Sequence, residues 1–451
     1  MTNDQAAAEK LIPPDVIPPG DLPPLRERDL PPPISLARMI GPSIILAGLA
    51  LGSGEFVLWP YITFKSQFVF FWACLLAVTM QYFLNLEIMR WTLATGETAM
   101  TGIIRLNRHM AWAFLLLNII PWMLPAWATG AADLIGWLIA EPTFKPDGNV
   151  IPGPYNVWIA LAGLILCGVI LTAGPIVYET VEKVQLFLVS LIMLTVICLA
   201  VWLLKDRPDA IAAQAVSTVT LGAPQFLPPL DDDLTPIALL GALAFAGAGG
   251  TMNLCQSNYI RDKGYGMGCH IGRITSPITG QEEAISEVGY HFPHTVENLR
   301  RWAAWWRGAC TEHFFSFLMT CLVCLVLLTL ISYVTFYDAA GQRLHDPGTI
   351  KGMRFIWEES LHVGELIGPA ARLAFLIMGV AILFTTEFGV LDAASRVSTD
   401  IVKVAWLREN QTWSEGRLYY AFLWGEIALA CAILLLNKYT GLDLGALALF
   451  K

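Results

Sequence analysis

The chain of 451 residues is 55% hydrophobic and only 14% charged, with a formal net charge of −9 at pH 7. Soluble domains carry roughly 25% charged residues, and several apolar runs here exceed the roughly 18 residues that a membrane helix needs. These values exclude an ordinary soluble domain and predict an all-α polytopic protein whose partner is the lipid bilayer. We expect no nucleic-acid partner.

Residues 1–35 differ from the rest of the chain. The stretch LIPPDVIPPGDLPPLRERDLPPPIS is rich in proline and poor in aromatic residues. Such a composition favours an extended, disordered segment. The stretch lacks the apolar core of a cleavable signal peptide. The sequence therefore predicts a disordered cytoplasmic tail.

The apolar runs that follow predict about nine complete membrane helices. If the N-terminus is cytoplasmic, most of the 28 Lys and Arg residues lie on the cytoplasmic side, as the positive-inside rule requires. The predicted localisation is integral, in a bacterial inner membrane with the N-terminus inside. The predicted helices are 37–65, 68–90, 110–140, 155–173, 177–204, 236–260, 308–335, 366–394 and 418–437.

Two of these helices are interrupted by glycine clusters, GSGE at 52–55 and AGGT at 248–251. Glycines release backbone polar groups, which the membrane tolerates only where they line a buried cavity. Breaks in the first and sixth helices predict a five-plus-five inverted repeat of the LeuT type, with unwound helices 1 and 6 and the substrate between them. The predicted substrate-binding residues are Gly52, Ser53, Gly54, Glu55, Gly249, Gly250, Thr251 and Asn253.

This repeat divides the chain into four parts. Residues 1–35 form the tail, 36–204 the first five-helix repeat, 205–235 an extracytoplasmic loop, and 236–451 the second, inverted repeat. A five-plus-five core needs ten spans, and the sequence ends at Lys451, where a tenth can begin. The second repeat is therefore predicted to be incomplete, with the chain truncated before or within the tenth span.

Glu55 and Thr251 carry the polar chemistry of the two breaks. A carboxylate near the middle of the membrane is costly and marks a functional site by default. Glu55 can hold a cation, a substrate amine or a proton, or it can be neutralised by a structural partner. Hydroxyl and carbonyl oxygens at the second break suit Mg²⁺, Mn²⁺ or Na⁺. Glu55 and Thr251 are therefore candidate metal ligands.

Further polar residues suggest a coupling ion. Asp133 in the third helix suits a proton relay or a structural pair. Thr385, Thr386 and Glu387 in the eighth helix resemble a cation shelf, although intramembrane hydroxyls also bond to their own helix. We expect coupling to H⁺ at Asp133 or to Na⁺ at Thr385 and Thr386. The sequence contains no phosphate loop, hydrolase elbow or zinc signature, so neither an enzyme nor a cofactor is expected.

Four segments resemble helices of the Nramp family of proton-coupled divalent metal transporters, which have the LeuT-type fold. GPSIILAGLALGSGE, AWATGAADLIG, YETVEKV and ALAFAGAGGTMNLCQS are similar to its first, third, fifth and sixth helices. The resemblance spans residues 37 to about 400. Asp133 matches one of two acidic residues of the third helix, and Asn253 matches the residue after the sixth-helix motif. The resemblance implies a proton-coupled carrier of divalent metal ions.

The family's metal ligands are replaced in this chain. Its first-helix Asp and Asn fall on Gly52 and Glu55, and its sixth-helix Met and His fall on Gly250 and Met252. One hypothesis is a hard-cation variant for Mn²⁺ or Mg²⁺, because loss of the thioether weakens selection for softer metals.

The alternative is an organic substrate. The GSG sequence is also similar to the amino acid–polyamine–organocation transporters, in which the break holds a carboxylate. Glu55 then meets the amine or guanidinium of a small organic solute. A second alternative is a sensor that transports nothing.

Overall fold

The structure, a computed structural model, describes residues 10–146, 148–223, 234–280, 288–345, 348, 350–410 and 412–440. Within these residues eight helices are long and apolar enough to cross a membrane. They are Pro42–Ser66 (α2, η1 and α3), Phe71–Thr95 (α4), Met110–Trp137 (α6 and α7), Asn156–Ala173 (α8), Val177–Leu204 (α9), Val296–Phe336 (α13, η4 and α14), Pro369–Ala405 (α16) and Glu415–Thr440 (α17).

The predicted sixth helix is divided into three shorter pieces: α11 (Pro236–Ala244), η2 (Gly250–Leu254) and α12 (Cys255–Lys263). All nine predicted helical regions are therefore helical in the structure. The seventh begins earlier than predicted, and the eighth ends later. The predicted tenth span falls on residues 441–451, outside the described residues.

Shorter elements connect the long helices. The described residues contain two pairs of strands: β1 (Arg26–Glu27) runs parallel to β4 (Tyr290–His291), and β2 (Thr143–Phe144) runs antiparallel to β3 (Val150–Ile151). The short helices are α1 (Leu36–Met39), α5 (Ala99–Leu106), α10 (Pro208–Val219), η3 (Gly266–His270) and α15 (Arg354–Ile367). Helix α10 lies within the predicted loop 205–235.

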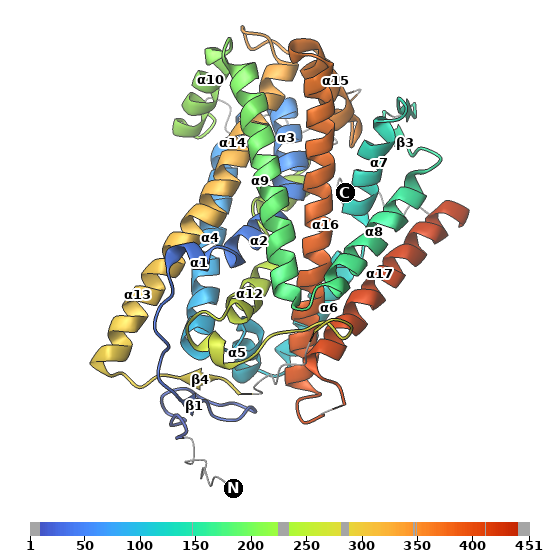
Figure 1. The fold of residues 1–451 in the computed structure, drawn as a ribbon. Helices are drawn as coiled ribbons and strands as arrows, with labels where there is room; N and C mark the ends of the chain where they lie inside the picture. The colour runs from blue at the N-terminus through green and yellow to red at the C-terminus, as the bar shows by residue number, and fades with distance from the viewer. Residues whose placement is uncertain are drawn as a thin grey trace.

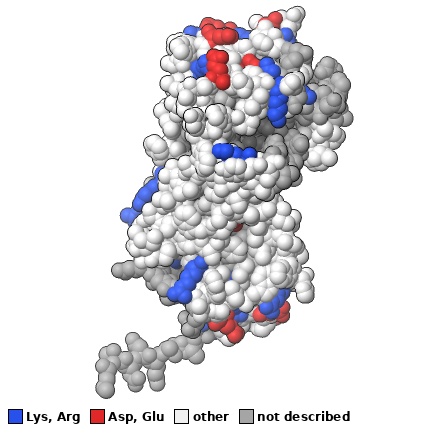
Figure 2. Space-filling model, turned by 90° about the vertical axis from the view of Figure 1, so that its right-hand side faces the viewer, with Lys and Arg blue, Asp and Glu red and all other residues white. Residues whose placement is uncertain are grey.

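Helix α16 is the central element of the bundle (Figure 1). It packs against α2, α6, α7, α9, α15 and α17, and most of its residues are buried. Helices α10 and α15 lie at one end of the bundle, whereas α5, β1 and β4 lie at the other (Figure 1). Charged side chains gather at these two ends, and the broad band between them is largely uncharged (Figure 2). This distribution is that of a membrane-spanning bundle.

The predicted disorder of the N-terminal tail is wrong for residues 10–35; residues 1–9 lie outside the described part. Leu25 and Leu30 are buried, and strand β1 pairs with β4. The guanidinium of Arg105 also holds the segment, because it donates to the carbonyl oxygens of Pro19 at 3.1 Å and Pro23 at 2.8 Å. Composition alone missed this order because a few apolar residues between prolines bury their side chains on the folded bundle.

Candidate functional site

The second glycine cluster is unwound, as predicted. Helix α11 ends at Ala244, and the short helix η2 begins only at Gly250. Gly247, Gly249 and Gly250 have φ values of 101°, 67° and 57°. Residues with a Cβ atom rarely adopt this backbone conformation. The glycines therefore permit the chain to turn out of the helix at this depth.

Gln81 on α4 satisfies the backbone groups that this break releases. Its amide nitrogen donates to the carbonyl of Ala244 at 3.0 Å, and its amide oxygen accepts from the backbone N–H of Gly249 at 3.0 Å. Two residues earlier, the indole N–H of Trp59 donates to the carbonyl of Ala242 at 3.2 Å. Unpaired backbone groups at a helix end are expensive inside a membrane. Gln81 is thus the side chain that ties the two sides of the break together.

Replacing Gln81 by alanine is expected to destabilise the protein. The substitution leaves the Ala244 carbonyl and the Gly249 N–H without this partner, and the loss at the buried Gly249 costs about 1–3 kcal/mol. We expect a lower thermal unfolding midpoint in detergent. Thr79→Ala is the matched control on the same helix, because the Thr79 hydroxyl bonds to the Leu75 carbonyl of its own helix at 2.7 Å. Equal midpoints for the two variants would contradict the bridging role.

The first glycine cluster differs from the expectation. It remains helical and forms a π-helix, η1 (Leu51–Leu58), between α2 and α3. A Cβ on Gly52 would lie 2.1 Å from Oγ1 of Thr386, and a Cβ on Gly54 would lie 1.9 Å from the carbonyl oxygen of Phe245. These glycines therefore allow α16 and the second break to approach helix 1 closely. Single-turn π-helices are frequent at functional sites.

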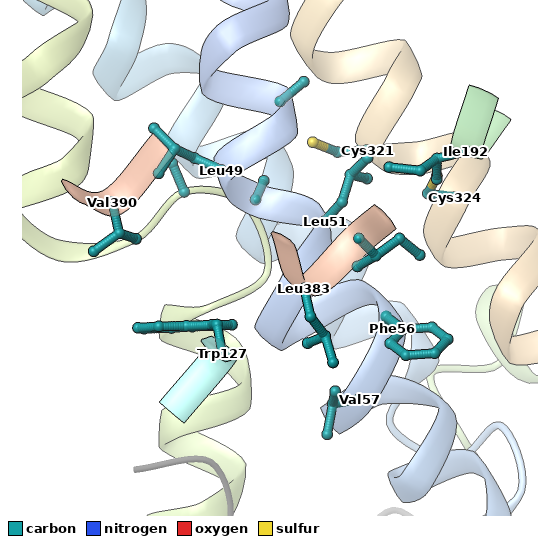
Figure 3. Close-up of a cluster of buried hydrophobic side chains, with 14 of the residues drawn as sticks. Leu49, Leu51, Phe56, Val57, Trp127, Ile192, Cys321, Cys324, Leu383 and Val390 are labelled. Carbon is teal, nitrogen blue, oxygen red and sulfur yellow. The ribbon is translucent and has the colours of Figure 1, made fainter. Parts of the chain in front are cut away.

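Glu55 joins the first glycine cluster to the second break. Its side chain is fully buried, and Oε1 accepts the backbone N–H of Gly247 at 3.2 Å. The thiol of Cys321 lies beside the carboxylate. Within the described residues Oε2 has no nitrogen or oxygen donor at hydrogen-bond distance. Cys321 belongs to a cluster of buried hydrophobic side chains that also contains Leu51 and Cys324 (Figure 3). A buried carboxylate thus keeps one oxygen available for a proton, a cation or a substrate donor.

A cavity of about 870 Å³ opens beside the second break. Gly249, Gly250, Thr251 and Asn253 line it, together with side chains from α4, α5 and α6 that are mostly apolar. Four of the eight predicted substrate residues therefore face one cavity. The first-helix residues 52, 54 and 55 are packed instead against α16, α14 and the second break.

The wall of this cavity at the break is aromatic. The ring of Trp122 on α6 stacks with Trp127 at 5.9 Å between centroids and meets Phe245 edge-on at 6.1 Å. Its indole N–H donates to Oγ1 of Thr251 at 2.8 Å. The amide oxygen of Asn253 is buried and has no hydrogen-bond partner within the described residues. The cavity thus offers aromatic surface and is lined by Asn253, whose amide oxygen is buried without a partner.

The predicted coupling residues occupy separate places. Thr386 donates to the carbonyl oxygens of Gly48 at 3.3 Å and Leu49 at 3.4 Å, so it faces helix 1. Thr385 instead bonds to Gln185 on α9. The hydroxyl and two carbonyls around Thr386 form a compact group of oxygens, the donor type that Na⁺ prefers.

The two acidic candidates bind other elements. Oε2 of Glu387 accepts the backbone N–H of Ala128 on α7 at 3.1 Å. Asp133, further along α7, accepts a hydrogen bond from Asn156 on α8. Glu387 therefore does not share the position of Thr386, because it points toward the third membrane helix.

The candidate metal ligands take different partners, since Glu55 holds Gly247 and Thr251 accepts from Trp122. In the described part of the chain, no group of three or more His, Cys, Asp or Glu residues is arranged to hold a metal ion. A cation at the breaks would therefore depend on hydroxyl, amide and backbone oxygens around Glu55. Such ligands suit Mg²⁺ or Mn²⁺ better than softer metals.

Three residues of this site escaped the sequence interpretation: Gln81, Trp122 and Gln185. Amides are rare in these largely apolar membrane helices, since α4 contains Gln81 and Asn85 and α9 contains Gln185. That rarity is the signal that can identify them, because an amide in a membrane helix seeks a partner on a neighbouring helix. Trp122 stands between Pro121 and Pro125, where α6 gives way to α7.

Solved structures with similar folds are membrane transporters. No family model and no curated protein matches the sequence. The manganese transporter of Eremococcus coleocola, solved with an aromatic bis-isothiourea compound, matches with a TM-score of 0.60 at 13% identity, over 92% of this chain and 74% of that one. The nucleobase-cation-symport-1 family transporter Mhp1, solved with bromovinylhydantoin bound, matches with a TM-score of 0.50 at 13% identity, over 91% and 78%.

These similarities confirm the predicted fold class. The chain is an all-α membrane protein with the LeuT-type fold. Its structural neighbours include the Nramp-like manganese transporter, which supports the predicted distant relationship to Nramp proteins. At 12–13% identity the match describes the fold and leaves the cargo to the residues of the site.

Proposed function

We propose that this protein is a secondary transporter that carries a small organic solute through the cavity beside the second helix break. The observation that supports this proposal is the cavity itself, which has about 870 Å³ of space and four break residues in its lining. Cavities for organic ligands are mostly apolar, with a few well-placed polar groups. A metal ion needs a small cage of oxygen ligands instead.

The lining indicates the chemistry of the solute. Trp122 and Phe245 offer aromatic surface, which favours an apolar or aromatic body. The unpaired amide oxygen of Asn253 calls for a hydrogen-bond donor on the solute. The proposed cargo is therefore a small organic amine or amino acid with an apolar or aromatic body.

A divalent cation is the second candidate. The observation that favours it is the buried carboxylate of Glu55, which has a free Oε2 among the described residues and lies beside the second break. The manganese transporter among the structural neighbours supports the same idea at the level of the fold. Mn²⁺ or Mg²⁺ bound here would retain several waters, because Glu55 is the carboxylate at the junction of the two breaks.

Uptake into proteoliposomes separates these candidates. The panel consists of Mn²⁺ and Mg²⁺ on one side and aromatic and aliphatic amines and amino acids on the other. We expect saturable uptake of at least one organic compound. Saturable metal uptake without organic uptake would favour the cation. Ligand-dependent thermal stabilisation without any uptake would identify a sensor.

Asn253→Ala tests the cavity directly. We expect the variant to raise the KM for the organic solute by about tenfold, the value of one lost hydrogen bond to a buried partner. Asn107→Ala, at the end of α5 and away from the break, is the control and is expected to keep the wild-type KM. An unchanged KM in Asn253→Ala would remove Asn253 from the binding site.

The coupling ion and the orientation belong to the same proposal. Coupling to H⁺ at Asp133, or to Na⁺ at Thr386, accords with the partners of these residues. The positive-inside rule supports a cytoplasmic N-terminus. The end of the bundle with α5, β1 and β4 then faces the cytoplasm (Figure 1).

A further inference from the structure

A buried polar cluster lies at the beginning of helix α2, away from the two breaks. Oγ of Ser43 donates to Oε2 of Glu312 and lies 2.8 Å from Nδ1 of His313. The amide nitrogen of Gln256 donates to the same Oγ at 3.3 Å. Ser43 and His313 are 0% exposed and Glu312 is 2% exposed. The sequence interpretation assigned these residues no part in the substrate site.

Glu312 also lies at the N-terminus of α2, because it accepts the hydroxyl of Ser43 in the first turn of that helix. The residue before α2, Gly41, has no side chain to cap it. The backbone N–H groups of Gly41 and Ser43 lie close enough to the Glu312 carboxylate to stabilise its charge, and Oε1 of Glu312 has no hydrogen-bond partner within the described residues. A negative charge is stabilising at a helix N-terminus, where free N–H groups carry partial positive charge. The charge on Glu312 therefore helps to hold α2 against α13.

His313 is fixed in position and has one open nitrogen. Its ring stacks between Tyr82 at 5.2 Å and Phe317 at 4.9 Å, nearly parallel to both. Nε2 is buried and has no partner within the described residues. A π-helical turn, η4 (Phe314–Met319), begins directly after it. An unpaired ring nitrogen aimed from a locked imidazole is a place where a proton can bind.

We propose that Glu312, Ser43 and His313 form a proton-binding relay that controls the attachment of helix α2. A serine oxygen donates one hydrogen bond and accepts two. In the charged state it donates to Glu312 and accepts from Nδ1–H of His313 and from Gln256. These three bonds use its full capacity. They fix the neutral histidine as the Nδ1–H tautomer with a free lone pair on Nε2.

The protonation step balances in protons and in bonds made and broken. A proton from water binds Nε2 of His313, and the Nδ1–H bond breaks as its proton passes to Oγ of Ser43. The original Ser43 proton passes to Oε2 of Glu312. Ser43 then donates to Nδ1 and accepts from the Glu312 hydroxyl and from Gln256. Both states satisfy the serine equally, and they differ by the loss of one negative charge at the N-terminus of α2.

The loss of that charge weakens the cap and loosens α2. Helix α2 continues directly into the π-helix η1, which carries Glu55 and meets the second break. Protonation at the start of helix 1 thus acts on the helix that carries Glu55 and contacts the second break. The inference that a proton binds here depends only on the contacts of Glu312, Ser43 and His313. The inference that this proton is the coupling ion rests on the proposed transport function.

The charged and titratable groups around the cluster indicate that Glu312 is the group that changes charge. In the part of the chain that the structure describes, no Lys or Arg forms an ion pair with Glu312. Glu182 on α9, close to Gly41, is neutralised by Lys263 at 2.6 Å. The remaining groups that face the cluster, from α4, α9, α13, η4 and the segment after α12, are the phenols Tyr82, Tyr178 and Tyr265, the thiol Cys310 and the hydroxyl Ser316.

Hydrogen exchange of the full chain in lipid nanodiscs tests the relay without any solute. The observable is the protection of the peptide 37–50 between about pH 8 and pH 5.5, corrected for the intrinsic pH dependence of exchange. We expect protection to fall about tenfold at acid pH, the effect of one charge at a helix end. Glu312→Gln should exchange at the acid rate at every pH, because its side chain is always neutral. Glu297→Gln, an exposed position on the same helix, should retain the wild-type profile.

The proposal would be overturned if protection in Glu312→Gln fell between about pH 8 and pH 5.5 as much as in the wild type. It would also be overturned if protection in the wild type did not change with pH. If Glu312→Gln does not fold, the same pH series is measured on Ser43→Ala, which removes only the shared hydroxyl. Its step should shift by about one pH unit or more, and an unchanged midpoint would also overturn the relay. Since no solute is present, a failure of the uptake experiment leaves this result intact.

Discussion

Gly54→Ala is expected to abolish uptake. It should also lower the thermal stability of the protein more than a Gly→Ala substitution at any other glycine of the two clusters. The new Cβ would lie 1.9 Å from the carbonyl oxygen of Phe245 and 2.7 Å from its carbonyl carbon. Real Cβ contacts are never this short, so the backbone of the second break must move. Overpacking of a buried site costs about 1–3 kcal/mol, and a carbonyl cannot rotate away as a side chain can. We expect a loss near the upper end of this range.

The control for this prediction is Gly163→Ala in α8, where an added Cβ meets nothing within 4 Å. Alanine is the better helix former by about 1 kcal/mol, so this variant should be as stable as the wild type or more so. Both variants are compared by thermal unfolding and by uptake into proteoliposomes. Wild-type uptake in Gly54→Ala would show that helix 1 and the second break do not need their close contact.

The two glycine clusters look alike in sequence yet serve different physical purposes. At the second break, three glycines with positive φ turn the chain out of the helix. At the first, the helix continues as a π-helix, and the glycines remove side chains where two elements nearly touch. A sequence records the absence of a side chain but not the reason for it. Only the position of Phe245 and Thr386 distinguishes close packing from unwinding.

Most of the fold could be predicted because the membrane imposes its own length scale. The apolar runs located all nine helical regions, and the internal register of the breaks indicated the LeuT-type arrangement that the structural neighbours confirm. The ends of α13 and α16 were missed because polar residues extend these helices beyond the apolar core. Hydropathy reports the thickness of the membrane and not the length of a helix.

The site was less predictable because its polar partners come from distant helices. Asn253 and Thr251 could be identified from their places beside the glycines. The partners Gln81 and Trp122 lie more than 120 positions away in sequence from the groups that they bind. The same limit applied to the tail, whose order depends on Arg105 and β4 rather than on its own composition.

Glu55→Gln is the second substitution with a large expected effect, and it separates charge from structure. The amide of glutamine has nearly the same shape, and its oxygen can still accept the N–H of Gly247. We therefore expect little change in the unfolding midpoint. Uptake should fall by about a hundredfold or more, because a buried charge pair with a cationic group is worth about 3–5 kcal/mol. Glu55→Ala should also destabilise, since it leaves the Gly247 N–H without this acceptor.

The comparison between Glu55→Gln and Glu55→Ala separates a structural role of Glu55 from a role of its charge in transport. If Glu55 only closes a hydrogen bond between the breaks, glutamine should transport like the wild type and alanine should be the impaired variant. If its charge meets the amine of a solute or a cation, both variants should lose uptake while only alanine loses stability. Glu297→Gln, which neutralises an exposed carboxylate on α13, controls for the loss of one charge. Retained uptake in Glu55→Gln would remove the Glu55 charge from the transport mechanism, whichever cargo the protein carries.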